Sequence, residues 1–235
     1  MLFDLDGTLC EHAGSAEALY RGTFEAAGID RFGDPDELWA ALEDPPDHDD
    51  PIGYVARGFA RVAARHGRTP VDATAIAEGF FETVDYADVV PRPGAAEAVE
   101  AAASAGQVGV VTNGPASRQA GKLESLPFGD AFGAVVCVGD RPRRKPNREP
   151  FDRALEALGV APAETLYVGD SLEFDVAGAQ NAGLAAAWCP TDGGRDPAPY
   201  RPEYVFESLG DLRGVLAGED GAETGRDGAG GDGAA

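Results

Sequence analysis

Three short apolar runs, separated by helical patterns, constrain the fold of this chain most strongly. The runs are Val108–Val111, Ala134–Val138 and Leu166–Val168. Short valine-rich runs without polar alternation are typical of strands that are buried on both faces. Helical patterns follow the first two runs, over Ala116–Ser125 and Pro150–Leu158. Strands that alternate with helices predict an α/β fold built on a doubly wound parallel sheet.

A further strand is predicted at the start of the chain, which reads Met-Leu-Phe-Asp-Leu-Asp-Gly-Thr over residues 1–8. Side chains alternate along a strand, so Asp4 and Asp6 are expected to point the same way. Two carboxylates beside apolar residues are costly unless a cation lies between them, and Mg²⁺ prefers carboxylate oxygens. The same residues also fit a strand that ends in an Asp-Gly turn. This segment alone leaves both interpretations open.

Residues 15–89 have helical patterns throughout. The residues Asp34–Glu37 provide an N-cap, a first-turn proline and a capping-box glutamate for one helix. Another pattern covers about residues 72–86, with apolar side chains at helical spacing. Phe80 and Phe81 in that pattern are expected to belong to the core of this helical segment.

The charge of the chain excludes one class of partner. It has 41 acidic and 19 basic residues, and its net charge is −22 at pH 7. Nucleic-acid binding needs lysine and arginine against phosphate, so no nucleic-acid partner is expected. No apolar run reaches the length of a membrane span, so no membrane partner is expected and a cytoplasmic location is the default.

Lysine is scarce, because Lys122 and Lys145 are the only two among the 19 basic residues. High acidity with little lysine is similar to proteins of salt-accumulating archaea, where salt screens the self-repulsion of the chain. We therefore expect a halophilic protein. A lysine that such a chain retains is a stronger functional candidate.

Chemically useful side chains stand where the predicted strands end. In an open parallel sheet, the carboxyl ends of the strands meet at the edge where ligands bind. Carboxylates, a hydroxyl, an amide and an ammonium group are therefore expected on one rim, where they can hold Mg²⁺ and a phosphoryl group together. These candidates are Asp4, Asp6, Thr112, Asn113, Lys145, Asp170 and Asp175.

The motifs, in chain order, resemble those of the haloacid dehalogenase superfamily of Asp-dependent phosphohydrolases, in its phosphoglycolate phosphatase-like branch. They are Asp4–Thr8, Val110–Gly114, Lys145-Pro146, and Gly169-Asp170-Ser171 with Asp175. The stretch Thr112–Leu126, which contains Gln119 and Lys122, also resembles the family. Only three residues precede Asp4, fewer than is usual there, so we expect a short first strand or a late chain start.

The resemblance implies a domain organisation. Residues 1–14 and 90–212 would form a Rossmann-like α/β catalytic core, and residues 15–89 an inserted α-helical cap. Residues 213–235 are expected to be a disordered acidic tail, because glycine, alanine and acidic residues dominate there. No oligomeric state is predicted.

The resemblance also implies a role for each candidate residue. Asp4 would be the nucleophile that forms an aspartyl-phosphate, and Asp6 the general acid and base. Thr112, Asn113 and Lys145 would bind the substrate phosphate. Mg²⁺ would be held by Asp4, Asp6 and Asp170, with Asp6 contributing its backbone carbonyl. Asp175 would bind the metal directly or orient a metal-bound water.

The expected function is that of a Mg²⁺-dependent phosphatase acting on a small phosphorylated metabolite. A phosphoglycolate-like acid, a sugar phosphate and a nucleoside monophosphate stay open as substrates. The alternatives are a phosphomutase, a 2-haloacid dehalogenase of the same superfamily and a non-catalytic binding module. The presence of Asp6 and Asp170 argues against the dehalogenase, whose chemistry needs neither Mg²⁺ nor a second acid/base aspartate.

Overall fold

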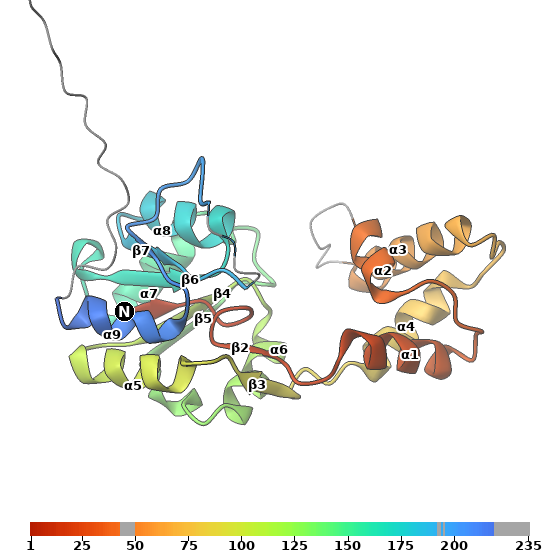
Figure 1. Ribbon diagram of the computed structural model, residues 1–235, viewed down its shortest axis with the longest axis horizontal. Coiled ribbons are helices and arrows are strands. Elements are labelled where there is room, and N and C mark those ends of the chain that lie inside the picture. The colour runs from red at the N-terminus through yellow and green to blue at the C-terminus, as the bar shows by residue number, and fades with distance from the viewer. Residues whose placement is uncertain (43–49, 192–193, 195, 219–235) are drawn as a thin grey trace, which may run out of the picture.

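The computed structural model describes residues 1–42, 50–191, 194 and 196–218. The chain forms an α/β lobe and a helical lobe that lie at opposite ends of the molecule (Figure 1). Within the described residues, none of the helices is long and apolar enough to cross a membrane.

A six-stranded sheet forms the centre of the α/β lobe, with the strand order β5-β4-β1-β6-β7-β8. All neighbouring strands are parallel. The strands are β1 (Leu2–Phe3), β4 (Gly109–Thr112), β5 (Ala134–Cys137), β6 (Leu166–Gly169), β7 (Ala185–Trp188) and β8 (Tyr204–Val205). The predicted α/β fold is therefore confirmed, and the short opening strand lies in the middle of the sheet.

Helices cover both faces of the sheet because the strand side chains alternate. Phe3, Val110 and Val168 pack into one apolar cluster with helices of the first face. The adjacent residues along the same strands, Leu2, Val111 and Tyr167, pack into a second cluster on the other face. The first face carries α5 (Ala95–Ala105), α6 (Ala116–Ser125) and α9 (Leu212–Leu216), and the second carries α7 (Glu149–Leu158) and α8 (Ala177–Asn181).

The helical lobe has an apolar core of its own. Its helices are α1 (Ala16–Ala27), α2 (Pro35–Ala41), α3 (Pro51–Arg65) and α4 (Ala73–Thr83). Tyr20, Phe24 and Phe59 pack against one another at ring-centroid distances of 5.1 to 5.8 Å. The Asp34 carboxylate and the Glu37 side chain form the predicted capping box at the start of α2.

Two antiparallel strands connect the lobes. They are β2 (Cys10–His12) and β3 (Val89–Pro91), which pair from Cys10 with Pro91 to His12 with Val89. The sequence analysis did not predict them, because a strand of three residues is too short to show alternation. Both chain crossings between the lobes pass through this pair (Figure 1).

One expected boundary differs from the structure. The tail was expected from residue 213, but α9 continues to Leu216, because Leu212 packs at the base of the first cluster. Residues 219–235 lie outside the described residues. Before α8, the π-helical turn Leu172–Val176 contains the buried Asp175, whose side chain lies against Gly169 of β6.

Candidate active site

All seven predicted site residues line one pocket at the carboxyl end of β1. Its volume is about 220 Å³. Asp4 directly follows β1 and its backbone N–H donates to the carbonyl of Val168, 2.9 Å away. The neighbouring strands β4 and β6 bring their own carboxyl ends beside it. The pocket is lined by Asp4, Asp6, Thr112, Asn113, Gly114, Lys145, Asp170, Ser171, Phe174 and Asp175.

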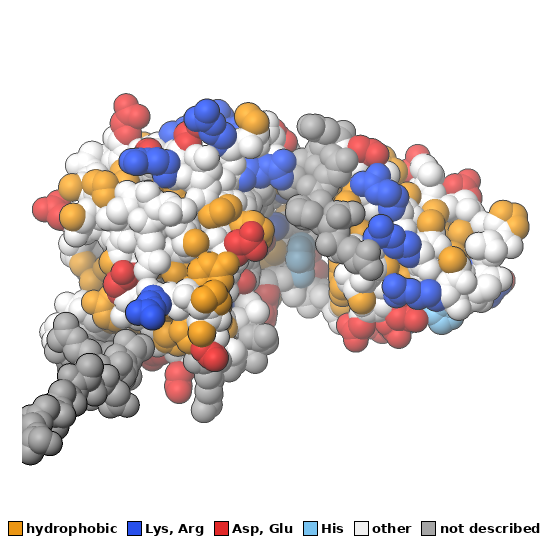
Figure 2. Space-filling view, turned by 90° about the horizontal axis from the view of Figure 1, so that it is seen from above, with side chains coloured by type: hydrophobic (Ala, Val, Ile, Leu, Met, Phe, Trp, Pro, Cys, Tyr) orange, Lys and Arg blue, Asp and Glu red, His pale blue; other side chains and the backbone are white. Residues whose placement is uncertain are grey.

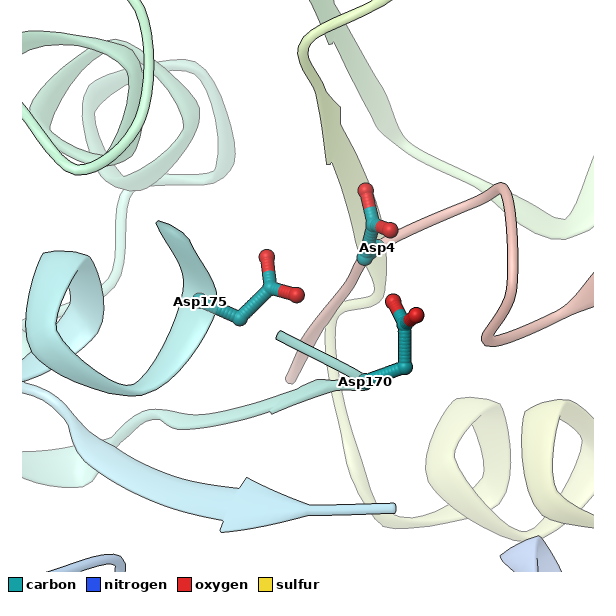
Figure 3. Close-up of side chains that lie close together, drawn as sticks. All are labelled: Asp4, Asp170 and Asp175. Carbon is teal, nitrogen blue, oxygen red and sulfur yellow. The ribbon is translucent and has the colours of Figure 1, made fainter. Parts of the chain in front are cut away.

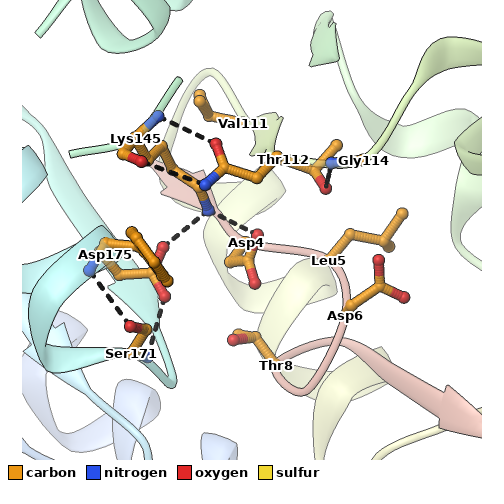
Figure 4. Close-up of polar contacts among 12 residues, drawn as sticks. Asp4, Leu5, Asp6, Thr8, Val111, Thr112, Gly114, Lys145, Ser171 and Asp175 are labelled. Carbon is orange, nitrogen blue, oxygen red and sulfur yellow. Dashed lines mark hydrogen bonds and ion pairs between the residues drawn. The ribbon is translucent and has the colours of Figure 1, made fainter. Parts of the chain in front are cut away.

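Lys145 lies at the centre of the buried part of this site (Figure 4). Its Nζ donates to Asp4 Oδ1 at 2.6 Å and to Asp175 Oδ1 at 2.7 Å. Burial by itself lowers the pKa of Lys145, but the carboxylates of Asp175 and Asp4 outweigh burial and raise it. The ammonium group is therefore kept charged between two carboxylates.

Tyr167 is a site residue that the sequence analysis missed. Lys145 Nζ donates to its hydroxyl at 2.9 Å, and the hydroxyl lies 2.9 Å from the carbonyl oxygen of Val111. A tyrosine in a buried strand usually belongs to the hydrophobic core, so its position did not indicate a role in the site. The residue type could have indicated the role, because a buried tyrosine hydroxyl needs a hydrogen-bond partner and Tyr167 lies near the end of a predicted strand.

Three carboxylates form an acidic cluster (Figure 3). Asp4, Asp170 and Asp175 each have an oxygen within 4.8 Å of the others. Burial raises the pKa of Asp4 to about 8 against the opposing effect of Lys145. Burial also raises the pKa of Asp170, with a further contribution from Asp175. One ammonium balances only one of three carboxylates, so this set fits a divalent cation that prefers oxygen ligands, such as Mg²⁺.

The three carboxylates are not equally available to a cation. Asp175 Oδ1 accepts from Lys145 and Oδ2 accepts from the backbone N–H of Ser171 at 2.9 Å. The Asp170 carboxylate accepts one hydrogen bond from a described side chain, the Thr8 hydroxyl at 3.3 Å. The geometry therefore favours Asp4 and Asp170 as direct ligands and Asp175 as the group that orients Lys145.

Gly7 permits the close approach of Asp170 to the turn after Asp4. Its φ is +77°, and a Cβ at this position would lie 2.6 Å from Asp170 Oδ2. A side chain at residue 7 would be strained and would collide with the cluster. The Asp-Gly turn thus lies directly against the acidic cluster, so the two interpretations of this segment are compatible.

Asp6 lies at the same pocket but has separate partners. Lys122 Nζ donates to its Oδ1 at 2.5 Å, and Gln119 Nε2 donates to its Oδ2 at 2.7 Å. The Asp6 carboxylate is not part of the acidic cluster that Asp4 belongs to. The Asp6 side chain is therefore held by Lys122 and Gln119, and the metal contact through the Asp6 backbone carbonyl stays a prediction.

Thr112 is arranged as a hydrogen-bond donor. Its Oγ1 accepts from Gln119 Nε2 at 2.6 Å and from the backbone N–H of Gly114 at 3.1 Å. With both acceptor positions used, the hydroxyl hydrogen remains to donate into the pocket. This arrangement agrees with the predicted contact from Thr112 to a phosphoryl oxygen.

The Asn113 side chain bonds the backbone of Lys145. Its Oδ1 accepts from the backbone N–H of Lys145 at 2.9 Å, and its Nδ2 donates to the Lys145 carbonyl at 3.1 Å. This two-way bond fixes the loop after β5 to the end of β4. Asn113 therefore positions Lys145, and phosphate binding by its side chain stays a prediction.

Comparisons with known proteins agree with this geometry. A family described as haloacid dehalogenase-like hydrolase matches residues 1–183. The chain is 34% identical to pyrimidine 5′-nucleotidase YjjG of Escherichia coli (strain K12), over 70% of this chain and 76% of that protein. It is 29% identical to phosphoglycolate phosphatase of Salmonella typhimurium, over 91% of this chain and 90% of that protein. Pyrophosphatase PpaX of Bacillus mycoides is matched over only 52% of its length.

Solved structures share the fold. The magnesium-bound HAD-hydrolase YfnB from Bacillus subtilis gives a TM-score of 0.70 at 24% identity, covering 92% of this chain and 97% of that chain. A 2-haloacid dehalogenase from Pseudomonas syringae gives 0.63 at 28% identity, covering 92% and 96%. Because the family match spans most of the chain and the fold agrees with it, the protein is an enzyme of the haloacid dehalogenase-like hydrolase family, as its motifs predict.

Proposed function

We propose that this enzyme is a Mg²⁺-dependent phosphatase that hydrolyses a small phosphomonoester through an aspartyl-phosphate. One observation carries the proposal. Lys145 Nζ donates to Asp4 at 2.6 Å, but Asp4 belongs to a cluster of three carboxylates, so one ammonium leaves two negative charges unbalanced. A phosphoryl group would add negative charge to this place, so both a lysine and a divalent cation are needed to receive it.

The chain's own residues supply the chemical steps. An oxygen of Asp4 attacks phosphorus, and the bond between phosphorus and the leaving oxygen breaks. The leaving oxygen takes a proton from Asp6. Water then attacks the phosphorus of the aspartyl-phosphate, gives its proton to Asp6, and frees Asp4 and inorganic phosphate.

The other groups hold the phosphoryl oxygens during transfer. Lys145 and the Thr112 hydroxyl donate to them, which lowers the charge repulsion with Asp4. Asp4 and Asp170 would hold Mg²⁺, which supplies further charge neutralisation to the transferring group. Asp175, Tyr167 and Asn113 keep Lys145 in place.

The helical lobe is proposed to act as a cap over this pocket. It is connected through the β2–β3 pair at the carboxyl end of the sheet, on the same side as Asp4 and Asp6. A cap in this position limits the access of water and contacts the leaving group of the substrate. We therefore assign substrate selection to residues 15–89 together with the rim of the core.

Phosphate release from a phosphomonoester panel tests the proposal. We expect activity with Mg²⁺, loss with EDTA, and recovery when Mg²⁺ is returned. Mg²⁺ alone should also raise the melting temperature, because it binds the folded cluster and not the unfolded chain. Asp170→Asn should weaken this stabilisation. The control, Asp130→Asn at an exposed position, should not.

Analysis of the products released separates the alternative activities. Halide release from a 2-haloacid that persists in EDTA would establish the dehalogenase instead. An isomerised phosphate ester without free phosphate would establish a phosphomutase. Absence of turnover on any ester, with Mg²⁺ causing no thermal shift, would leave a binding module and reject the proposal.

A further inference from the structure

A second pocket lies between the two lobes, next to the candidate active site. Its volume is about 490 Å³. Gly114 lines the first pocket and Pro115, the next residue, lines the second, so the two share a border. Figure 2 shows the two lobes as separate masses with a recess between them. A substrate whose phosphate lies at Asp4 therefore has this space available for its leaving group.

Aromatic side chains from the helical lobe make up much of the wall. Trp39 and Phe80 lie edge to face at 6.4 Å, and Phe80 and Phe81 at 5.4 Å. Trp39 is 48% exposed although it is large and apolar. Phe80 and Phe81 pack against the helical core as expected, but they also line this pocket. Their outer faces are thus available to a ligand.

One cation faces these rings from the core. Arg118 on α6 lines the pocket, with its guanidinium 4.5 Å from the ring centroid of Tyr86 and 5.6 Å from that of Phe81. Stacking on two rings fixes the plane of the guanidinium. Among the described residues, its side chain contacts these two rings and forms no hydrogen bond or ion pair, so its N–H edge is left to a ligand.

We propose, on the basis of the phosphatase function above, that the leaving group is a planar ring bearing acceptor oxygens, as in a nucleoside. The ring stacks against the aromatic wall, and Arg118 donates to its carbonyl oxygens. Arg118 is then the residue that determines specificity for the leaving group, and a two-carbon acid is a poor substrate.

Size and chemistry both favour this class. Pockets of about 300 to 1,000 Å³ enclose ligands of drug size, whereas a glycolate group would fill a small corner of this one. An arginine has donors and no acceptors, so it selects rings that present acceptors. Nucleobases also stack on aromatic side chains, and each stacked base contributes about 1–3 kcal/mol to the binding free energy.

Three esters test the proposal through kcat/KM: uridine 5′-monophosphate, benzyl phosphate and 2-phosphoglycolate. The first has a ring with acceptors, the second a ring without them, and the third no ring. We expect uridine 5′-monophosphate to exceed 2-phosphoglycolate at least about tenfold. Arg118→Met should reduce the first about tenfold and leave the others within about twofold. Arg21→Met, an exposed arginine on α1 that lines neither pocket, is the matched control.

Two kinetic outcomes would overturn the inference while leaving the phosphatase intact. One is a preference for 2-phosphoglycolate over the ring esters. The other is an equal loss on all three esters in Arg118→Met, which would reflect a general effect on the fold or on phosphate binding.

Binding of uridine itself gives a readout that does not depend on catalysis. Trp39 lies in the pocket, so uridine should quench its fluorescence, and Trp39→Phe should remove the signal. Arg118→Met should weaken the affinity about tenfold. Saturable binding by an enzyme that hydrolyses no ester would reject the phosphatase and support the pocket. Absence of quenching by uridine would reject the pocket.

Discussion

At the scale of single residues, the two lysines of the chain each bond one of the two aspartates in the first motif. Lys145 holds Asp4 and Lys122 holds Asp6. Both lysines are almost entirely buried. In a chain that otherwise uses arginine, a compact ammonium fits between carboxylates and phosphate where a planar guanidinium would crowd them.

Replacement of Lys145 should therefore be severe whatever the substituent. Lys145→Met leaves the carboxylates of Asp4 and Asp175 together without their cation. We expect kcat to fall at least about 100-fold and the free energy of unfolding to fall by about 3 kcal/mol. Lys145→Arg should also lose activity, because the guanidinium does not fit. Steady-state kinetics and urea unfolding provide the measurements, and an Arg variant with wild-type kcat would contradict the account.

The Lys122–Asp6 pair should show direct coupling. Lys122 is buried but the Asp6 side chain is 45% exposed, so solvent weakens the pair. A double-mutant cycle with Lys122→Met and Asp6→Asn should give a coupling free energy of about 1 kcal/mol in urea unfolding. Additive effects of the two substitutions would show that the contact does not position Asp6.

At the scale of elements, the site is made by strand ends. β4 ends at Thr112, Asp4 and Asp170 directly follow β1 and β6, and Lys145 lies in the loop after β5. Because a parallel sheet brings its carboxyl ends together, the sequence sufficed to predict this convergence. Strand ends in the structure agree with the predicted apolar runs to within a residue or two.

The Tyr167 hydroxyl links strand β6 to Lys145 and to the carbonyl of Val111 on β4, so Tyr167 tests how these elements are held together. Tyr167→Phe keeps the packing against Phe151, whose ring lies 4.9 Å away, and removes only the hydroxyl. We expect the free energy of unfolding to fall by about 1–2 kcal/mol, since Lys145 loses a buried partner. Equilibrium urea denaturation measures this. An unchanged midpoint would mean that the hydroxyl contributes nothing to holding Lys145.

Some features could not be predicted because their cause is tertiary. The partner of Asp6 is set by the packing of α6 against the core, although the motif had drawn attention to Gln119 and Lys122. The side-chain role of Asn113 depends on the loop after β5 lying beside it. Phe80 and Phe81 have the spacing of core residues, and only the position of the helical lobe shows that they also line a pocket. Residue type and spacing do not contain this information.

At the scale of the whole molecule, charge dominates. The net charge of the 235-residue chain is −22, so its acidic side chains repel one another. Dissolved salt shortens the Debye length and so weakens this repulsion. If the chain is adapted to salt, its melting temperature should rise steadily from low salt to molar KCl. Calorimetry at several KCl concentrations measures this, with sucrose as a non-ionic control. A melting temperature independent of KCl would remove the halophilic proposal and leave the catalytic account unchanged.

The two-lobe arrangement gives each part a separate function. We propose that the α/β lobe binds the phosphate and that the recess toward the helical lobe binds the leaving group. Variants of the recess should therefore change the choice of substrate, while variants of the acidic cluster should change turnover on every substrate.

The central claim is that Asp4 becomes phosphorylated. The most direct test is rapid acid quenching during turnover of a phosphomonoester labelled on phosphorus, followed by mass analysis of the peptide that contains Asp4. We predict a transient phosphoryl group on Asp4 that is absent in Asp4→Asn and that both forms and decays more slowly in Asp6→Asn, which lacks the acid and base of the two steps. Phosphate release by Asp4→Asn at the wild-type rate, with no labelled peptide, would contradict it.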